Sequence, residues 1–207
     1  MDKRYSEVKA DEILQKNRQW TTQFKTTRSF KKLTQPEKKA TLYITNSFMG
    51  LTYKFFLREP RQITASSTKE VILNMMPEKI AATDVFMQSV VPVLRRYFVF
   101  LGVQRKISNS DTLVKALDSI DVSAFVKKAS DPHYWNSDKK SSMAILMGFK
   151  SEMPNDKVQE IQHQKNFDVP LVVCMDYTTA NFPENVILLT DKVRQKYEKL
   201  IKTKIKM

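Results

Sequence analysis

The chain has 207 residues, of which 42% are apolar and 28% are charged, and its formal net charge is +13. This apolar content is enough for the core of one folded domain, and it excludes a disordered polar chain. The sequence holds only three glycines, whereas β-sandwiches, P-loop enzymes and dinucleotide-binding folds need many in their turns and phosphate loops. We therefore expect an all-α bundle of about seven to nine helices.

Two helices are predicted in residues 1–60. Apolar residues recur at helical spacing over residues 5–25, which predicts the first helix, and a polar basic loop is expected at residues 26–33. Thr34, followed three residues later by Glu37, is a capping-box pattern that begins the second helix, and Pro60 should end it. The apolar stripe of this helix consists of Ile44, Phe48, Leu51 and Phe55.

A short helix and a long apolar helix are predicted next. Ser67 and Glu70 have the spacing of a capping box and begin the short helix, which Pro77 should end. Thr83 or Asp84 should cap the long helix. Shorter helices are expected further along the chain, at residues 110–120, 122–129, 143–148 and 156–167.

The long apolar helix contains two helix-breaking signals. Pro92 lacks an amide donor and its ring collides with the preceding turn, so a kink or a split is expected near Ser89. Gly102 is typical of a helix end. The residues expected to be largely buried in the core are Phe48, Leu51, Phe55, Phe86, Leu94, Phe98 and Leu117.

Residues 1–168 are predicted to form the helical bundle, and residues 169–207 a connector and a C-terminal amphipathic helix packed on it. Residues 169–177 are rich in valine but show no evident partner strand, so a short strand, a buried connector and a short helix stay open. Pro183 begins the final helix. Beside its apolar arc lies a basic stripe that could contact an anion or a partner: Lys192, Lys196, Lys199 and Lys206.

Residues 67–167 follow a characteristic order of segments. These are MMPEKIAA, VFMQSVVPVLRRYFVFLG, SNSDTLVKAL, DPHYW, KKSSMAILMGF and a helix that ends in KNF. This order resembles an all-helical domain of unknown function that occurs in many bacterial proteins, some of which carry a SEC-C zinc motif beside it. The SEC-C motif needs several cysteines, and this chain has only Cys174. The resemblance therefore implies a bacterial helical bundle, without zinc and without a catalytic residue.

Residues suited to catalysis or metal binding are few. The spacings of His133, His163 and Cys174 match no zinc motif, and a single cysteine cannot form an intrachain disulfide. The sequence has no G-x-S-x-G nucleophile elbow. A di-metal bundle needs a Glu-x-x-His pattern on two helices, whereas only His163 has a glutamate, Glu160, three residues before it. The aromatic turn at residues 131–135 is expected to anchor the chain on the bundle. We therefore expect no enzyme activity and no cofactor or metal.

Basic charge is the strongest functional signal in the sequence. Residues 1–60 hold 13 Lys and Arg against 6 Asp and Glu, and the final helix has a second excess. The N-terminus lacks the apolar core of a signal peptide, and charges interrupt the longest apolar stretch, so we expect a cytoplasmic protein without a membrane partner. Its partner is expected to be another protein. The alternative is a nucleic acid bound through the basic surfaces without sequence preference.

Overall fold

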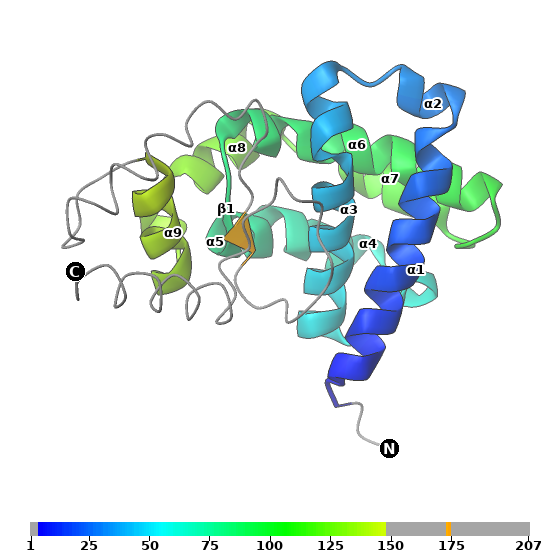
Figure 1. Cartoon of the computed structure of the whole chain (residues 1–207), viewed down its shortest axis with the longest axis horizontal. Helices are drawn as coiled ribbons and strands as arrows, with labels where there is room; N and C mark the ends of the chain where they lie inside the picture. Colours follow the sequence, from blue (N-terminus) through cyan, green and yellow to red (C-terminus); the bar gives the residue numbers. More distant parts are fainter. Residues whose placement is uncertain (1–3, 148–172, 175–207) are drawn as a thin grey trace, which may run out of the picture.

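The computed structural model describes residues 4–147 and 173–174 of the chain. Within these residues the chain forms nine α-helices, which confirms the all-α fold class (Figure 1). They are α1 (Glu7–Lys25), α2 (Arg28–Lys31), α3 (Gln35–Phe56), α4 (Ala65–Glu70), α5 (Met76–Lys79), α6 (Asp84–Val103), α7 (Ser110–Asp118), α8 (Val122–Ser130) and α9 (Ser137–Met147). The shorter elements are the 3₁₀ turns η1 (Pro60–Gln62) and η3 (Pro132–Tyr134), the π-helical turn η2 (Val71–Met75), and the strands β1 (Ile80–Ala81) and β2 (Val173–Cys174).

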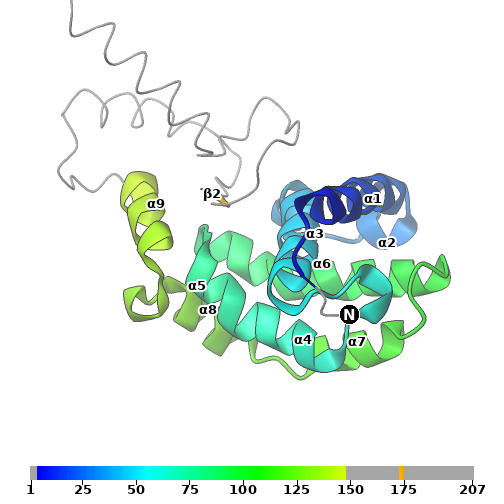
Figure 2. The ribbon, with the colours of Figure 1, turned by 90° about the horizontal axis from the view of Figure 1, so that it is seen from below.

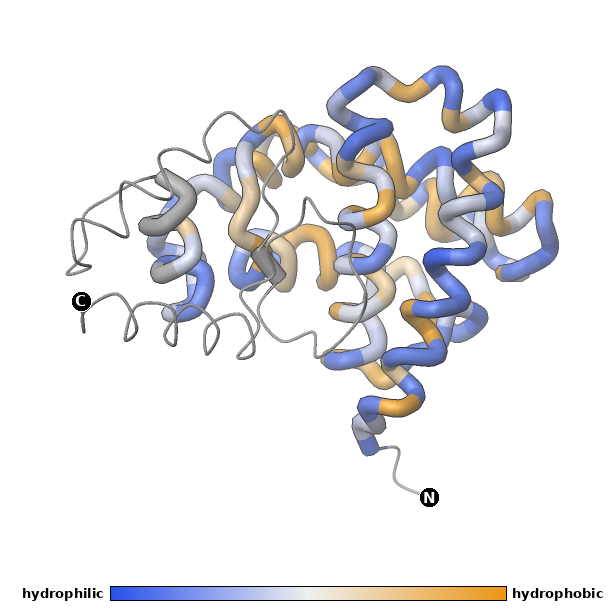
Figure 3. The backbone as a smooth tube through the Cα atoms, viewed as in Figure 1, coloured by the Kyte–Doolittle hydropathy of each residue, from blue (hydrophilic) through white to orange (hydrophobic). Residues whose placement is uncertain are grey.

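The central helix of the fold is α6. It packs against α3, α7 and α8, and many of its residues belong to the hydrophobic type coloured orange along the tube in Figure 3. By length and composition α6 is able to cross a membrane, but 61% of its most apolar stretch is buried inside the protein. Such burial is typical of the core helix of a folded domain, and α1, α2, α3, α7 and α8 all contact α6.

The apolar stripe of α3 packs on α6 except at its last position. Phe48 and Phe98 are fully buried, and their ring centroids lie 5.3 Å apart. Phe55, which is predicted to be buried, is instead 41% exposed. It belongs to the last turn of α3, where its ring lies under the ammonium group of Lys79, 4.9 Å from the ring centroid. The other predicted core residues are buried: Leu51, Phe86, Leu94 and Leu117.

Local capping signals place the beginnings of α3 and α6 correctly. The side chain of Thr34 accepts a hydrogen bond from the Glu37 amide, and the Glu37 carboxylate accepts one from the Thr34 amide. The Thr83 hydroxyl caps α6 by accepting a hydrogen bond from the Phe86 amide at 3.4 Å. The end of α3 differs from the prediction, because Leu57 takes a left-handed conformation with φ of 50° and ends the helix before Pro60, which begins η1 instead.

The predicted basic loop at residues 26–33 contains a short helix, α2. The Thr27 hydroxyl caps this helix by accepting a hydrogen bond from the Phe30 amide at 3.2 Å. Phe30 packs edge-on against Phe24 with a centroid separation of 5.5 Å, and Leu33 is buried. The loop prediction is wrong because two apolar anchors one turn apart are too few to distinguish a helix from a loop.

A continuous helical stretch runs from α4 through η2 to α5, and it differs from the prediction at both ends. Thr64 is the cap, and its side chain accepts a hydrogen bond from the amide of Ser67, the predicted cap, at 3.2 Å. Pro77 lies inside α5 instead of ending the helix. The π turn η2, which precedes Pro77, is closed by a hydrogen bond from the Met76 amide to the Val71 carbonyl. A proline ring collides with the carbonyl one regular turn earlier, so this wider turn leaves room for Pro77.

The helix α6 contains both of its predicted breaking signals without breaking at either. It runs as one helix through Pro92, and the hydroxyl of Ser89 donates to the Val85 carbonyl at 2.7 Å. Gly102 lies inside the last turn rather than at its end. A Cβ at this position would collide with the side chain of Ser110, so glycine serves the close approach of α7 to α6.

The residue that ends α6 in the left-handed conformation is Arg105, with φ of 53°. The Lys106 amide then donates to the Leu101 carbonyl at 2.9 Å, which closes the helix end. Glycine is favoured at such a position because a Cβ atom strains the left-handed backbone by roughly 1–2 kcal/mol.

The variant Arg105→Gly is therefore expected to raise the free energy of unfolding by about 1 kcal/mol, since glycine adopts this backbone conformation without the Cβ penalty. Arg105→Ala keeps the Cβ atom and should stay near the wild-type stability. Urea titration of both variants measures the difference between them. Equal stabilities of the glycine and alanine variants would contradict the assigned backbone strain.

Strands β1 and β2 pair in antiparallel register, with Ile80 opposite Cys174 and Ala81 opposite Val173. Residues 169–177 thus include a short strand, whose partner lies in the MMPEKIAA segment. Two residues are too few to show strand alternation. The predicted helices at residues 110–120 and 122–129 are confirmed as α7 and α8, and the predicted helix at 143–148 matches the second half of α9 as far as Met147. The predicted helix at residues 156–167 and the C-terminal helix lie outside the described residues.

Candidate functional site

Several of the residues singled out in the sequence lie outside the described residues: His163, Lys192, Lys196, Lys199 and Lys206. His133 is exposed in η3, where its Nδ1 lies 3.3 Å from the Asp131 carboxylate. In the described part of the chain, no group of three or more His, Cys, Asp or Glu side chains is arranged to hold a metal ion. A candidate site must therefore be sought among other groups.

The aromatic turn after α8 anchors the chain on the bundle, as predicted. Trp135 is buried, and its indole N–H donates a hydrogen bond to the Ala129 carbonyl at 2.7 Å. Tyr134 is half exposed, with the Lys128 ammonium 5.1 Å from its ring centroid. The turn fixes the direction in which the chain leaves α8.

Lys139 of α9 is a buried lysine that sequence reasoning missed, since nothing in the sequence distinguishes it from its exposed neighbour Lys140. Its side chain donates hydrogen bonds to the carbonyls of Pro77 at 2.7 Å and Ala129 at 2.8 Å. Burial lowers the pKa of Lys139 to about 8, and the nearby Asp84 carboxylate opposes this shift. The amino group thus joins α5, α8 and α9, and its hydrogen bonds are those of a structural residue.

A second buried polar cluster joins α1, α3 and α6. The Tyr97 hydroxyl donates to Asn17 Oδ1 at 2.8 Å, and Asn17 Nδ2 donates to Asn46 Oδ1 at 2.8 Å. The hydroxyls of Thr21 and Thr45 share a hydrogen bond of 3.0 Å. Burial raises the pKa of Tyr97, so its hydroxyl stays protonated and acts as the donor. Because the partners come from three helices, this cluster favours one alignment of these helices over others.

An open groove of about 750 Å³ lies between the first turn of α6 and α8. Its walls include Asp84, Val126 and Ser130, and the Ser130 hydroxyl donates to the Asp84 carboxylate at 2.6 Å. Neither Lys139 nor Tyr97 lines this groove. The two ionisable groups with the largest pKa shifts in the described residues lie in separate clusters, Lys139 between α5, α8 and α9 and Tyr97 between α1, α3 and α6.

The surface around α2 concentrates positive charge, and we call it the basic corner. It consists of Lys25, Arg28, Lys31, Lys32, Lys38 and Lys39, all of them exposed except Lys38, which is half-buried. The one acidic residue between positions 25 and 39 is Glu37, whose carboxylate accepts a hydrogen bond from the Thr34 amide at 2.7 Å. That carboxylate is thus held at the N-terminus of α3, and cations dominate the rest of the surface.

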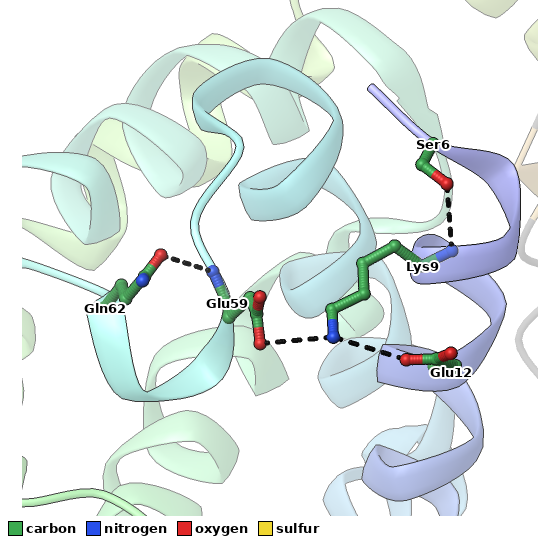
Figure 4. Close-up of polar contacts among 5 residues, drawn as sticks. All are labelled: Ser6, Lys9, Glu12, Glu59 and Gln62. Carbon is green, nitrogen blue, oxygen red and sulfur yellow. Dashed lines mark hydrogen bonds and ion pairs between the residues drawn. The ribbon is translucent and has the colours of Figure 1, made fainter. Parts of the chain in front are cut away.

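Positive charge is compensated at the other end of α1. The Lys9 ammonium lies 3.3 Å from the Glu12 carboxylate and 3.5 Å from that of Glu59 (Figure 4), and the hydrogen bond to Glu12 is the main cause of the raised pKa of Lys9. Within residues 4–147, no ion pair with an acidic residue is formed by Lys25, Arg28, Lys31, Lys32 or Lys38. Five cations that form no ion pair with an acidic residue in this part of the chain therefore lie together at the basic corner.

Comparisons of the chain with protein-family models, with curated proteins and with solved structures find no match. The resemblance of residues 67–167 to a bacterial helical domain accordingly stays a prediction.

Proposed function

We propose that this protein is a non-enzymatic, all-α interaction module that binds a negatively charged macromolecular partner through the basic corner. The observation that carries the proposal is a group of five cations that form no ion pair within residues 4–147: Lys25, Arg28, Lys31, Lys32 and Lys38. A surface of one charge sign attracts partners of the opposite sign and accelerates their association. The net charge of +13 acts in the same direction.

The absence of an enzyme activity is part of the proposal, and the placement of the perturbed groups supports it. Lys139 is held by two backbone carbonyls between α5, α8 and α9, whereas Tyr97 is held between α1, α3 and α6. An acidic segment of another protein and a nucleic acid both carry the charge that the basic corner would bind.

Binding of a polyanion should depend on where the cations lie rather than on their number. We expect that replacing Lys25, Arg28, Lys31 and Lys32 by glutamine weakens binding of a fluorescent oligonucleotide or polyglutamate by about tenfold or more at low salt. The matched control replaces four exposed lysines outside the corner, namely Lys69, Lys115, Lys127 and Lys140. Fluorescence anisotropy measures the dissociation constant for each variant.

The two variants carry the same net charge, so total charge alone would weaken both equally. A loss confined to the corner variant supports the proposal. Equal losses in both variants, or no binding of either probe to the wild-type chain at low salt, would overturn it. Circular dichroism checks folding, and both variants should keep wild-type stability within about 1 kcal/mol because the substituted side chains are exposed.

A further inference from the structure

A second group of cations lies at the same end of the molecule as the basic corner. Arg105 and Lys106 occupy the loop between α6 and α7, and both views place this loop and α2 at one end (Figures 1 and 2). Packing of Phe24 against Phe30 of α2 and Phe100 of α6 connects the two regions, with centroids 5.5 Å and 5.4 Å apart. Nothing in the sequence indicates this proximity, because α3, α4 and α5 all lie between the two groups along the chain.

The loop also brings in a cation from η1. The Arg61 guanidinium donates through Nε to the Lys106 carbonyl at 3.3 Å, and the side chain of Arg61 is otherwise on the surface. Arg61 and Lys106 are thus neighbours although they come from separate segments of the chain, and η1 itself lies near the beginning of α1, where Glu59 pairs with Lys9.

Arg105 is held in a conformation that favours glycine, with φ of 53°, and it is exposed. An exposed arginine at such a position costs backbone strain and gains no packing in the core. Strained residues of this kind concentrate at functional sites, where the side chain has a use that offsets the strain. Contact with an anion is the use that suits a guanidinium group.

The chemistry of this surface distinguishes between the two classes of anionic partner. Protein interfaces depend on a few apolar or aromatic anchors, whereas nucleic-acid interfaces are more polar and much more positively charged. At the basic corner the apolar residues face inward: Leu33 is buried, and Phe30 packs on the core. Among the described residues, none of the large exposed apolar side chains lies between positions 25 and 39.

We propose that the partner of the basic corner is a nucleic acid, whose phosphate backbone runs from α2 across the α6–α7 loop and contacts Arg105. This inference rests on the function proposed above. The helix at the corner, α2, has four residues and is too short to read bases in a groove, so the contacts are with phosphates and are independent of sequence. A sequence isoelectric point near 9.7 together with clustered cations fits such binding.

Arg105 provides a sharp test, because its replacement by glycine should strengthen the fold while it weakens binding. We expect Arg105→Gly to raise the melting temperature and to weaken binding of a mixed-sequence DNA duplex severalfold. The slope of log affinity against log salt should fall by about 0.9, the contribution of one phosphate contact. Arg105→Ala should show the same loss of binding without the gain in melting temperature, and Arg105→Lys should keep the wild-type slope.

The probes are the DNA duplex and polyglutamate, each titrated into the full chain at several salt concentrations. Unchanged duplex affinity and slope for both Arg105→Gly and Arg105→Ala would exclude the loop from the interface and overturn the inference. Tighter binding of polyglutamate than of the duplex would also overturn it, but would leave the interaction module intact with an acidic protein as the partner. Binding of neither probe at low salt would overturn the proposed function itself.

Discussion

Replacing Phe98 by alanine is expected to lower the free energy of unfolding by about 3–5 kcal/mol. Phe98 is fully buried in α6, and its ring packs edge-on against Phe48 of α3 at 5.3 Å. The substitution removes the transfer free energy of the ring and leaves a cavity that the surrounding helices fill only in part. Chemical denaturation followed by far-ultraviolet circular dichroism measures the loss.

Val99 provides the matched control, since it is the next residue of α6 and is 42% exposed. Val99→Ala should change the free energy of unfolding by less than about 1 kcal/mol, because little area is removed from the core. A negligible loss for Phe98→Ala, or equal losses for the two variants, would show that the core-facing side of α6 is assigned wrongly.

The second large effect is expected in the pH dependence of stability, and it depends on Lys139. Burial lowers the pKa of Lys139 from 10.5 to about 8 in the folded chain. Between these two values the unfolded chain binds one proton more than the folded chain, so stability rises as the pH increases. This gain in the free energy of unfolding amounts to about 3 kcal/mol. It is complete above 10.5, the pKa of the unfolded chain, and it is lost as the pH falls towards 8.

The variant Lys139→Met isolates this effect, because it shares every other titration of the chain, including that of Tyr97. The difference in unfolding free energy, wild type minus variant, should increase by about 3 kcal/mol between pH 7.5 and 10.5. Urea titrations at each pH measure it. A difference that stays constant would mean that the carbonyls of Pro77 and Ala129 keep the ammonium group protonated despite its burial.

Features of the fold that depend on neighbouring residues were predictable from the sequence. The helix caps are of this kind: Thr34, which forms a capping box with Glu37, and Thr83 both accept a hydrogen bond from an amide within the next turn. The exposure of Phe55 was not predictable, because it depends on where α3 passes the edge of its neighbours. The π turn before Pro77 was not predictable either, since no periodicity over so short a segment indicates it.

The same distinction applies to the candidate site. The basic excess of residues 1–60 is visible in the composition, but the pairing of Lys9 with Glu12 and Glu59 is only partly local. The uncompensated part of the charge becomes evident only once the ion pairs are known. The role assigned to Arg105 depends on a backbone angle and on the approach of α2 to α6, neither of which has a sequence signal.

The π turn η2 has a further consequence for how this fold tolerates insertions and deletions. Such a turn is equivalent to a regular helical turn with one residue added. Deletion of one residue between Val71 and Met75 would restore a regular helix, but it would rotate all that follows by about 100°. The Pro77 carbonyl would then turn away from Lys139, and Ile80 would leave its register with β2. The number of residues in this turn therefore sets the orientation of α5 and β1 relative to α4.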